Sequence, residues 1–309
     1  TRSYADSNGD GIGDLNGITA KLDYLADLGI DAIWLTPFYE SPNVDFGYDI
    51  ANYMTVGKEY GTLSDYDRLI SEAASRGIQI INDLVLNHTS DRHPWFVDSR
   101  SSRSSSKRDW YIWHDPVDDS APNNWQSIFG GSAWEMDALT DQYYYHFFYP
   151  GQPDLNWRNP AVQDELNKVM RFWLDRGAAG FRLDVPDTLL EDPGMQDNPI
   201  DEGLNWVGDP NMRNEYNMNL PEVHSIMRQL RKVVDEYPAA ILLGETGSPE
   251  TIDELLKWYG DSDELHLAMN FLYTNVKELS AEEFIKHVID SDRNADIGWP
   301  VYLLSNHDR

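Results

Sequence analysis

Short runs of apolar and β-branched residues alternate with amphipathic stretches along almost the whole chain. Six of these runs have the length of a buried strand and are bounded by polar or turn-forming residues. They are residues 32–35, 78–86, 180–185, 241–244, 265–270 and 301–304. This alternation is typical of a parallel sheet wrapped by helices, because each parallel crossover needs a connection about as long as a helix.

The clearest helix pattern stands between residues 221 and 238. Apolar residues recur there every three or four positions, which places them on one face of a helix. They are Val223, Ile226, Met227, Leu230, Val233, Val234 and Tyr237. Pro221 suits a first turn and Pro238 ends the pattern, since proline lacks the N–H group that a helix interior needs. We expect this helix to pack on the sheet.

Repeated strand and helix units favour a (β/α)₈ TIM barrel. A dinucleotide fold is disfavoured because no GxGxxG turn follows a strand run. The spacing between the strands near Asp83 and Arg182 is about twice that of the other pairs, which indicates an insertion after the third barrel strand. The prediction is an incomplete barrel at residues 1–87 and 156–309, with an inserted subdomain at residues 88–155.

Two features of the insert are open to interpretation. Residues 99–108 hold six serines and four basic residues, which predicts a solvated, mobile loop. Aromatic side chains can stack on sugar rings or fill a small core, and for each tryptophan singly we expect core packing. The tryptophans concerned are Trp95, Trp110, Trp113, Trp125, Trp134 and Trp157.

Composition narrows the classes of partner. The 309 residues include 53 acidic and 24 basic side chains, a formal charge of −29, so a polyanion such as nucleic acid is repelled. No apolar run approaches the roughly 18 to 20 residues that span a bilayer, and no signal-like stretch opens the sequence. There is no cysteine, which excludes disulfides and thiolate chemistry. We expect neither nucleic-acid nor membrane partners, and a cytoplasmic location.

Polar side chains gather at the carboxyl ends of the candidate strands, which in a parallel barrel all face one mouth. The set comprises Asp83, Asn87, His88, Arg182, Asp184, Glu245, His307 and Asp308. In acetal cleavage one carboxylate attacks the anomeric carbon and a second carboxyl group protonates the departing oxygen. Strand alternation puts Arg182 beside Asp184, where its charge can hold the aspartate ionised, while Glu245 stays protonated as the acid.

Five motifs then carry a family resemblance. DLVLNH (residues 83–88), GFRLDV (180–185), GET (244–246) and SNHD (305–308), in this order, resemble the four signature regions of glycoside hydrolase family 13, the α-amylase family. QPDLNW (152–157) is similar to the motif of its α-glucosidase and oligo-1,6-glucosidase branch. Each motif alone is weak, but five in order are highly specific.

The resemblance implies a retaining, exo-acting α-glucosidase that removes terminal α-linked glucose from short oligosaccharides or α-glucosides, with possible transglucosylation. It assigns Asp184 as nucleophile, Glu245 as general acid and base, and Asp308 as transition-state stabiliser. The residues implied to contact or line the glucose pocket are Tyr48, Asp49, His88, Phe148, Arg182 and His307. Among these, Asp49 is expected to hold the terminal glucose, and Phe148 either lines the pocket or packs in a core.

Several alternatives stay open. Val185 resembles the α-1,6-cleaving branch, whereas Pro186 and residues 189–199 resemble α-glucosidases of mixed linkage preference. Trehalose synthases and sucrose isomerases share the same signatures and rearrange the glucosyl unit instead of hydrolysing it. A non-catalytic carbohydrate-binding or transporter-associated relative is an alternative of another class, although such transporter partners lose the acidic trio that this chain retains.

The segment at residues 6–14 offers oxygen ligands at alternate positions, as the first part of a calcium loop does. Gly17 stands where an EF-hand carries a bidentate glutamate, so no EF-hand is expected, and a metal-free glycine-rich turn is the alternative. The resemblance implies a structural Ca²⁺ or Mg²⁺, with no organic cofactor. Its ligands would be Asp6, Asn8, Asp10, the Ile12 carbonyl and Asp14.

The resemblance covers essentially the whole chain. Relative to the family, the sequence begins in the loop after the first barrel strand and stops one residue past NHD. We therefore expect the first and last barrel strands and the C-terminal β-domain to lie outside residues 1–309, and the open sheet edges to make this segment fold poorly alone.

Overall fold

The computed structural model describes residues 1–247, 249, 251–274 and 280–307. At the centre of this described part lies a five-stranded parallel sheet in the order β1, β4, β8, β11, β12. The strands are β1 (Ala32–Leu35), β4 (Gln79–Val85), β8 (Gly180–Asp184), β11 (Ile241–Gly244) and β12 (Leu267–Ala268). Because all five run in the same direction, their carboxyl ends lie at one edge of the sheet, and the predicted α/β class is confirmed.

Five of the six predicted strands form, and the sixth does not. Residues 301–304 contribute one isolated parallel bridge, between Tyr302 and Asn270. The preceding strand β12 is only two residues long, so it presents few backbone groups with which a next strand could pair.

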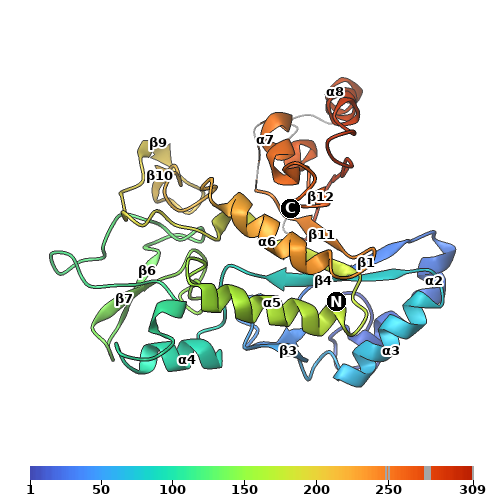
Figure 1. The fold of residues 1–309 in the computed structure, drawn as a ribbon, viewed down its shortest axis with the longest axis horizontal. Helices are drawn as coiled ribbons and strands as arrows, with labels where there is room; N and C mark the ends of the chain where they lie inside the picture. The colour runs from blue at the N-terminus through green and yellow to red at the C-terminus, as the bar shows by residue number, and fades with distance from the viewer. Residues whose placement is uncertain (248, 250, 275–279, 308–309) are drawn as a thin grey trace.

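Helices cover the sheet, and local signals explain where they begin. Figure 1 shows α5 (Pro160–Leu174) and α6 (Val223–Val234) across the middle of the molecule. The apolar stripe of α6 is buried as predicted. Helix α5 starts with Pro160 behind an Asn159 cap, and α3 (Leu63–Ala74) starts with a capping box. In that box the Thr62 hydroxyl accepts from the Asp65 N–H while the Asp65 carboxylate accepts from Thr62.

The insert has a small sheet and core of its own. Strands β5 (Trp113–His114), β7 (Gln142–Tyr145) and β6 (Trp134–Asp137) pair antiparallel in that order. A separate apolar cluster beneath them is formed by Ile112, Trp125, Ala133, Trp134, Tyr145 and Phe147. A bridge from His88 to Asp154 joins the two ends of the insert, and a bridge from Tyr111 to Leu155 joins its middle to its second end. The six tryptophans pack in or against these cores as expected, whereas the boundaries at 88 and 155 stay a prediction.

The solvated loop predicted at residues 99–108 is wrong at both of its ends. Ser99 is buried in the last turn of α4 (Pro94–Ser101), and Arg108 is 7% exposed. The Arg108 guanidinium lies 3.4 Å from the centre of the Trp113 ring and donates to the Ser99 carbonyl at 3.1 Å. A long arginine stem buries well against an aromatic face, so a count of polar residues misjudges this segment.

Most of the remaining described elements are short. The hairpins are β2 (Tyr39–Glu40) with β3 (Asn52–Val56), and β9 (Ile200–Leu204) with β10 (Pro210–Met212). The helices are α1 (Leu15–Thr19), α2 (Leu22–Asp27), α7 (Ile252–Leu256) and α8 (Ala281–Arg293), and the 3₁₀ turns are η1 (Arg108–Trp110), η2 (Pro186–Thr188), η3 (Lys257–Tyr259) and η4 (Phe271–Tyr273). None of the helices in the described ranges combines the length and apolar character needed to cross a bilayer.

Candidate active site

The sheet register brings the polar strand ends together. Asp83 on β4 is the direct partner of Arg182 on β8, and Leu243 on β11 is the partner of Arg182 on the other side. Asp184 ends β8, and Glu245 follows the last residue of β11. Residues more than 150 positions apart in the sequence thus meet at one edge of the sheet, as the strand pattern predicted.

Arg182 is the centre of this cluster. Its Nη1 donates to both carboxylate oxygens of Asp83 at 3.0 Å and to Asp184 Oδ1 at 2.6 Å. Its Nη2 lies 2.6 Å from Glu245 Oε2. The Arg182 side chain is 1% exposed and does not line the cavity described below. Because Arg182 is buried against three carboxylates, it orients them, and its contact with the sugar stays a prediction.

The surroundings of Asp184 and Asp83 favour the protonated forms of these two carboxyl groups. Burial raises the pKa of Asp184 well above its ordinary value, the charges of Glu245 and Asp83 add to this, and Arg182 opposes it. Burial also raises the pKa of Asp83, again against the effect of Arg182. The one cation does not fully offset the burial of Asp83 and Asp184, so Arg182 holds Asp184 ionised less firmly than its neighbouring position predicted.

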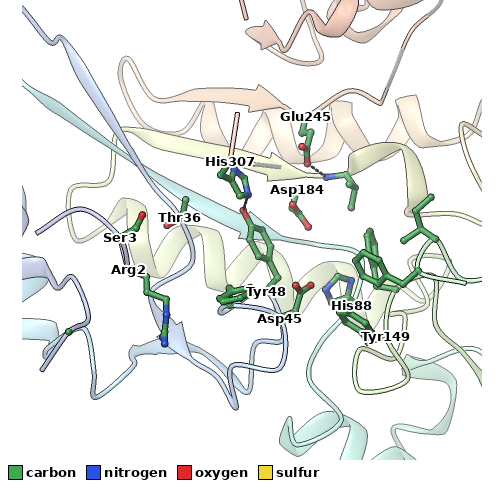
Figure 2. Close-up of a pocket in the computed structure, with 16 residues that line it drawn as sticks. Arg2, Ser3, Thr36, Asp45, Tyr48, His88, Tyr149, Asp184, Glu245 and His307 are labelled. Atoms are coloured by element: carbon green, nitrogen blue, oxygen red, sulfur yellow. Dashed lines mark hydrogen bonds between the residues drawn. The ribbon is translucent and has the colours of Figure 1, made fainter. Parts of the chain in front are cut away.

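A cavity of about 840 Å³ opens beside the cluster, within the usual size of a small-molecule site. In Figure 2, Asp184 and Glu245 approach it from the sheet while His88 and Tyr149 approach from the opposite side. Val185 also lines the cavity, and its backbone N–H points to Glu245 Oε2 at 3.5 Å. The structure therefore places two carboxyl groups at the wall of one ligand-sized space.

His88 and Phe148 both line the cavity. The Gln152 amide donates to His88 Nε2 at 3.0 Å and to Asp45 Oδ2 at 2.9 Å, so the QPDLNW motif contributes by holding two cavity residues. Burial lowers the pKa of His88 to about 3, which keeps the imidazole neutral. The Phe148 ring lies 5.0 Å from the His88 ring, so Phe148 takes the pocket-lining position rather than a purely internal one.

Asp49 does not reach the cavity. It is fully buried, and its carboxylate accepts from the Ser41 hydroxyl at 2.9 Å and from the N–H groups of Asp45 and Val44 at 3.0 and 2.9 Å. The aspartate of this loop that lines the cavity is Asp45. The expectation for Asp49 is corrected because hydrogen bonding to its own loop turns the carboxylate inward.

Tyr48 and His307 form one wall of the site. The Tyr48 hydroxyl lies 2.9 Å from His307 Nε2, and the two rings are nearly parallel at 5.8 Å (Figure 2). The same hydroxyl donates to Asp83 Oδ2 at 3.2 Å. The SNHD segment thus reaches the cavity through His307, while Asp308 lies outside the described residues.

Sequence reasoning missed Asp187. It is 1% exposed, and neither carboxylate oxygen has a hydrogen-bond partner on another described residue. Burial, with a smaller contribution from the charge of Glu245, raises its pKa to about 7. The carboxylate lies directly under Gly247, where an added Cβ would meet Asp187 Oδ2. The sequence signal that could have pointed to Asp187 is its place three positions after Asp184.

Residues 6–14, the predicted cation loop, are held in a turn by hydrogen bonds within the loop. Asp6 accepts from the N–H groups of Asn8, Gly9 and Gly11 at 2.7 to 3.0 Å. Asp14 caps α1 by accepting from Gly17 at 2.7 Å. The described residues hold no cluster of three or more His, Asp or Glu side chains placed to bind a metal. The oxygen donors of the loop still suit a hard divalent cation. The bound cation therefore stays a prediction.

Two carboxyl groups that share one cavity wall at the carboxyl edge of a parallel sheet fit the catalytic domain of a glycoside hydrolase. The chain belongs to the α-amylase family, glycoside hydrolase family 13, because residues 1–308 match the family described as "Alpha amylase, catalytic domain". The predicted family and the predicted incomplete TIM barrel are confirmed.

Individual relatives are also similar over the whole chain. It is 46% identical to a probable alpha-glucosidase of Rhizobium meliloti over 99% of the chain and 40% identical to the oligo-1,6-glucosidase of Parageobacillus thermoglucosidasius over 100%. It spans only 58% and 56% of their lengths. A crystal structure of an alpha-glucosyl transfer enzyme matches with a TM-score of 0.92 and 42% identity, covering 99% of this chain and 59% of that one.

Proposed function

We propose that the protein is a retaining, exo-acting α-glucosidase with Asp184 as nucleophile and Glu245 as general acid and base. One observation carries this proposal: both carboxyl groups line the same 840 Å³ cavity and are held 2.6 Å from different nitrogens of one buried guanidinium. The names of the relatives, alpha-glucosidase and oligo-1,6-glucosidase, support the choice of an α-linked glucoside as substrate.

The reaction proceeds in two displacements. Arg182 binds Oδ1 of Asp184, which leaves Oδ2 to attack the anomeric carbon. As the glycosidic C–O bond breaks, Glu245 gives its proton to the departing oxygen, and a glucosyl ester forms on Asp184. Glu245 then takes a proton from water, whose oxygen displaces the aspartate and releases glucose with its original anomeric configuration.

Substrate positioning falls to the residues around the two carboxyl groups. Neutral His88, Tyr48 and His307 offer hydrogen-bonding groups at the cavity wall, and Asp45 offers a carboxylate. We assign Asp45 to a glucose hydroxyl, since an acceptor beside the amide of Gln152 suits a hydroxyl donor. Asp308 keeps its proposed role as the transition-state stabiliser.

Initial rates on maltose, isomaltose and sucrose test the activity and its linkage preference. NMR of the first product should show α-glucose before mutarotation. Failure of the full-length protein to cleave any of the three would defeat the proposal. The likeness to a glucosyl transfer enzyme favours transfer as a second activity, and analysis of products made from sucrose separates hydrolysis from transfer or isomerisation.

The loop aspartates provide a paired prediction. Asp45→Asn should lower kcat/KM about 10- to 100-fold with little change in the melting temperature, because it removes a charged hydrogen bond to substrate. Asp49→Asn should instead destabilise the fold by about 1 to 3 kcal/mol, because an amide cannot accept all three loop hydrogen bonds. Kinetics and thermal melting of both variants check this. The reverse pattern would return the glucose contact to Asp49.

We propose that the loop at residues 6–14 binds one structural Ca²⁺. Replacing CaCl₂ with EGTA should then lower the melting temperature by several degrees, since a ligand at about 100 times its Kd adds roughly 2.7 kcal/mol to stability. Asp10→Asn should remove this difference, whereas Asp23→Asn on the exposed side of α2 should keep it. Identical melting of the parent protein in both solutions would contradict the proposal.

A further inference from the structure

Gln152 connects the insert to the polar wall of the cavity without lining the cavity itself. Its side chain is fully buried, and it is not among the residues around the 840 Å³ space. The Gln152 N–H donates to the Tyr149 carbonyl at 2.8 Å, and the Gln152 side-chain oxygen accepts from the Tyr149 N–H at 3.1 Å. These two hydrogen bonds close the turn at residues 149–152, so they fix the direction of the Gln152 side chain.

Both hydrogens of the Gln152 amide nitrogen are also used. Nε2 donates to Asp45 Oδ2 at 2.9 Å and lies 3.0 Å from His88 Nε2. Rotating the amide by half a turn would place its oxygen against the Asp45 carboxylate, which has no hydrogen to give, and would leave the Tyr149 N–H facing another donor. The hydrogen bonds therefore allow one orientation of the amide, with the NH₂ group toward Asp45 and His88.

This orientation decides which nitrogen of the His88 ring carries the hydrogen. Burial lowers the pKa of His88 to about 3, so the ring is neutral and can accept at one nitrogen only. Two amide groups compete for that role. Gln152 Nε2 lies 3.0 Å from His88 Nε2, and Asn87 Nδ2 lies 3.3 Å from His88 Nδ1. The shorter contact belongs to the amide whose orientation is fixed, so Nε2 accepts and the hydrogen is on Nδ1.

Three separate segments therefore meet at one amide group. Asp45 lies in the loop between β2 and β3, His88 follows β4, and Gln152 belongs to the end of the insert. Asp45 and His88 both line the cavity, and Gln152 donates to an acceptor atom of each. A buried amide with all of its hydrogen-bonding groups satisfied holds its partners in one geometry, because moving either partner away leaves a buried polar group unpaired.

Resting on the glucosidase function proposed above, we propose that Gln152 is a positioning residue of that reaction: its amide NH₂ group sets the arrangement of Asp45 and the tautomer of His88 that the glucosyl unit requires. Gln152 touches neither the substrate nor the reacting atoms, because it lies behind two residues that line the cavity. The role depends on the amide hydrogens as well as on shape, so a side chain of the same size that gives no hydrogen should not replace it.

Gln152→Glu in the full-length protein separates the hydrogens from the shape. The carboxylate can still accept from Tyr149, but it faces Asp45 with a like charge and gives no hydrogen to His88. We expect kcat/KM for maltose to fall about 10- to 100-fold at pH 7 relative to the parent protein, the usual effect of losing hydrogen bonds to a charged group. Two carboxylates in one site hold a proton tightly, and a protonated side chain donates again, so this loss should shrink at least about threefold at pH 5.

Gln229→Glu is the matched control, since it makes the same chemical change elsewhere. Gln229 is exposed on α6 and does not line the cavity. Its kcat/KM should stay within about twofold of the parent value at both pH values, because surface substitutions away from a site have small effects.

A double-mutant cycle shows whether Gln152 acts through Asp45. Combining Asp45→Asn with Gln152→Glu exchanges the donor and the acceptor and leaves one negative charge in this pair. The loss caused by Gln152→Glu should therefore be at least about fivefold smaller in the Asp45→Asn protein than in the parent protein. If Gln152→Glu does not fold, Gln152→Met, which adds no charge, takes its place, and its loss should likewise be smaller in the Asp45→Asn protein.

The outcomes separate this inference from the glucosidase proposal. Equal losses at pH 5 and pH 7, or losses that simply multiply in the double variant, overturn the inference and leave Gln152 as support for the turn at residues 149–152. Turnover of maltose by the parent protein upholds the glucosidase in that case. Absence of turnover of maltose, isomaltose and sucrose by the parent protein overturns the glucosidase, and the inference with it.

Discussion

Asp184→Asn is expected to reduce kcat for α-glucoside hydrolysis by at least about 10⁴-fold, because an amide cannot form the glucosyl ester and loss of a nucleophile typically has effects of this size or larger. The change is nearly isosteric, and the amide oxygen can still accept from Arg182 Nη1. Rates on maltose and on an aryl α-glucoside measure the loss. Asp164→Asn, on the exposed face of α5, is the control and should retain full activity.

Stability distinguishes lost chemistry from lost folding in that variant. Burial raises the pKa of Asp184 in the folded protein, so the folded state binds this proton more tightly than the unfolded chain does. The wild-type protein therefore loses stability as the pH rises above about 4, the ordinary value for aspartate. Asp184→Asn lacks this loss, so it should melt at the same temperature as wild type or higher, with a difference that grows with pH. Turnover within tenfold of wild type would instead favour a binding or scaffold protein.

The sequence predicted those features that depend on periodicity and on strand ends. Alternation located β1, β4, β8 and β11, and the carboxyl ends of parallel strands had to meet, so Asp83, Arg182, Asp184 and Glu245 could be placed together before any coordinates. The missing sixth strand shows the limit of this reasoning. A strand needs a partner, and the brevity of β12 is not visible in the apolar run at residues 265–270.

Side-chain direction could not be predicted, because it is decided by hydrogen bonds between residues that no simple spacing relates. Asp45 and Asp49 stand in one loop, and only the N–H groups of Val44 and Asp45 show that Asp49 faces inward. Arg182 was placed correctly beside Asp184, but the sharing of its guanidinium with Asp83 and Glu245 could not be predicted, since these carboxylates come from other parts of the sheet. Burial of Arg108 depends in the same way on the distant ring of Trp113.

Arg182→Met should have the largest effect on stability, about 3 to 5 kcal/mol at pH 7. Methionine fills much of the same volume but leaves three carboxyl groups without their shared cation, and Asp83 and Arg182 are at most 1% exposed. Urea unfolding of the full-length protein at several pH values measures the loss. Arg171→Met, which breaks a half-exposed ion pair with Glu236 on the surface, is the matched control and should cost less than about 1 kcal/mol.

The pH dependence of that loss tests its cause. Burial already raises the pKa of Asp83 and of Asp184 against the opposing charge of Arg182, so removing the cation should raise both further. Groups whose folded pKa exceeds the unfolded value destabilise the protein increasingly as the pH rises through the interval between the two. The deficit of Arg182→Met should therefore be small near pH 4 and largest at neutral pH, and adding Asp83→Asn should recover part of it. A deficit that is independent of pH and unaffected by Asp83→Asn would mean that Arg182 stabilises the sheet by packing against Trp34, rather than by charge. The Arg182 guanidinium carbon lies 4.6 Å from the centre of the Trp34 ring.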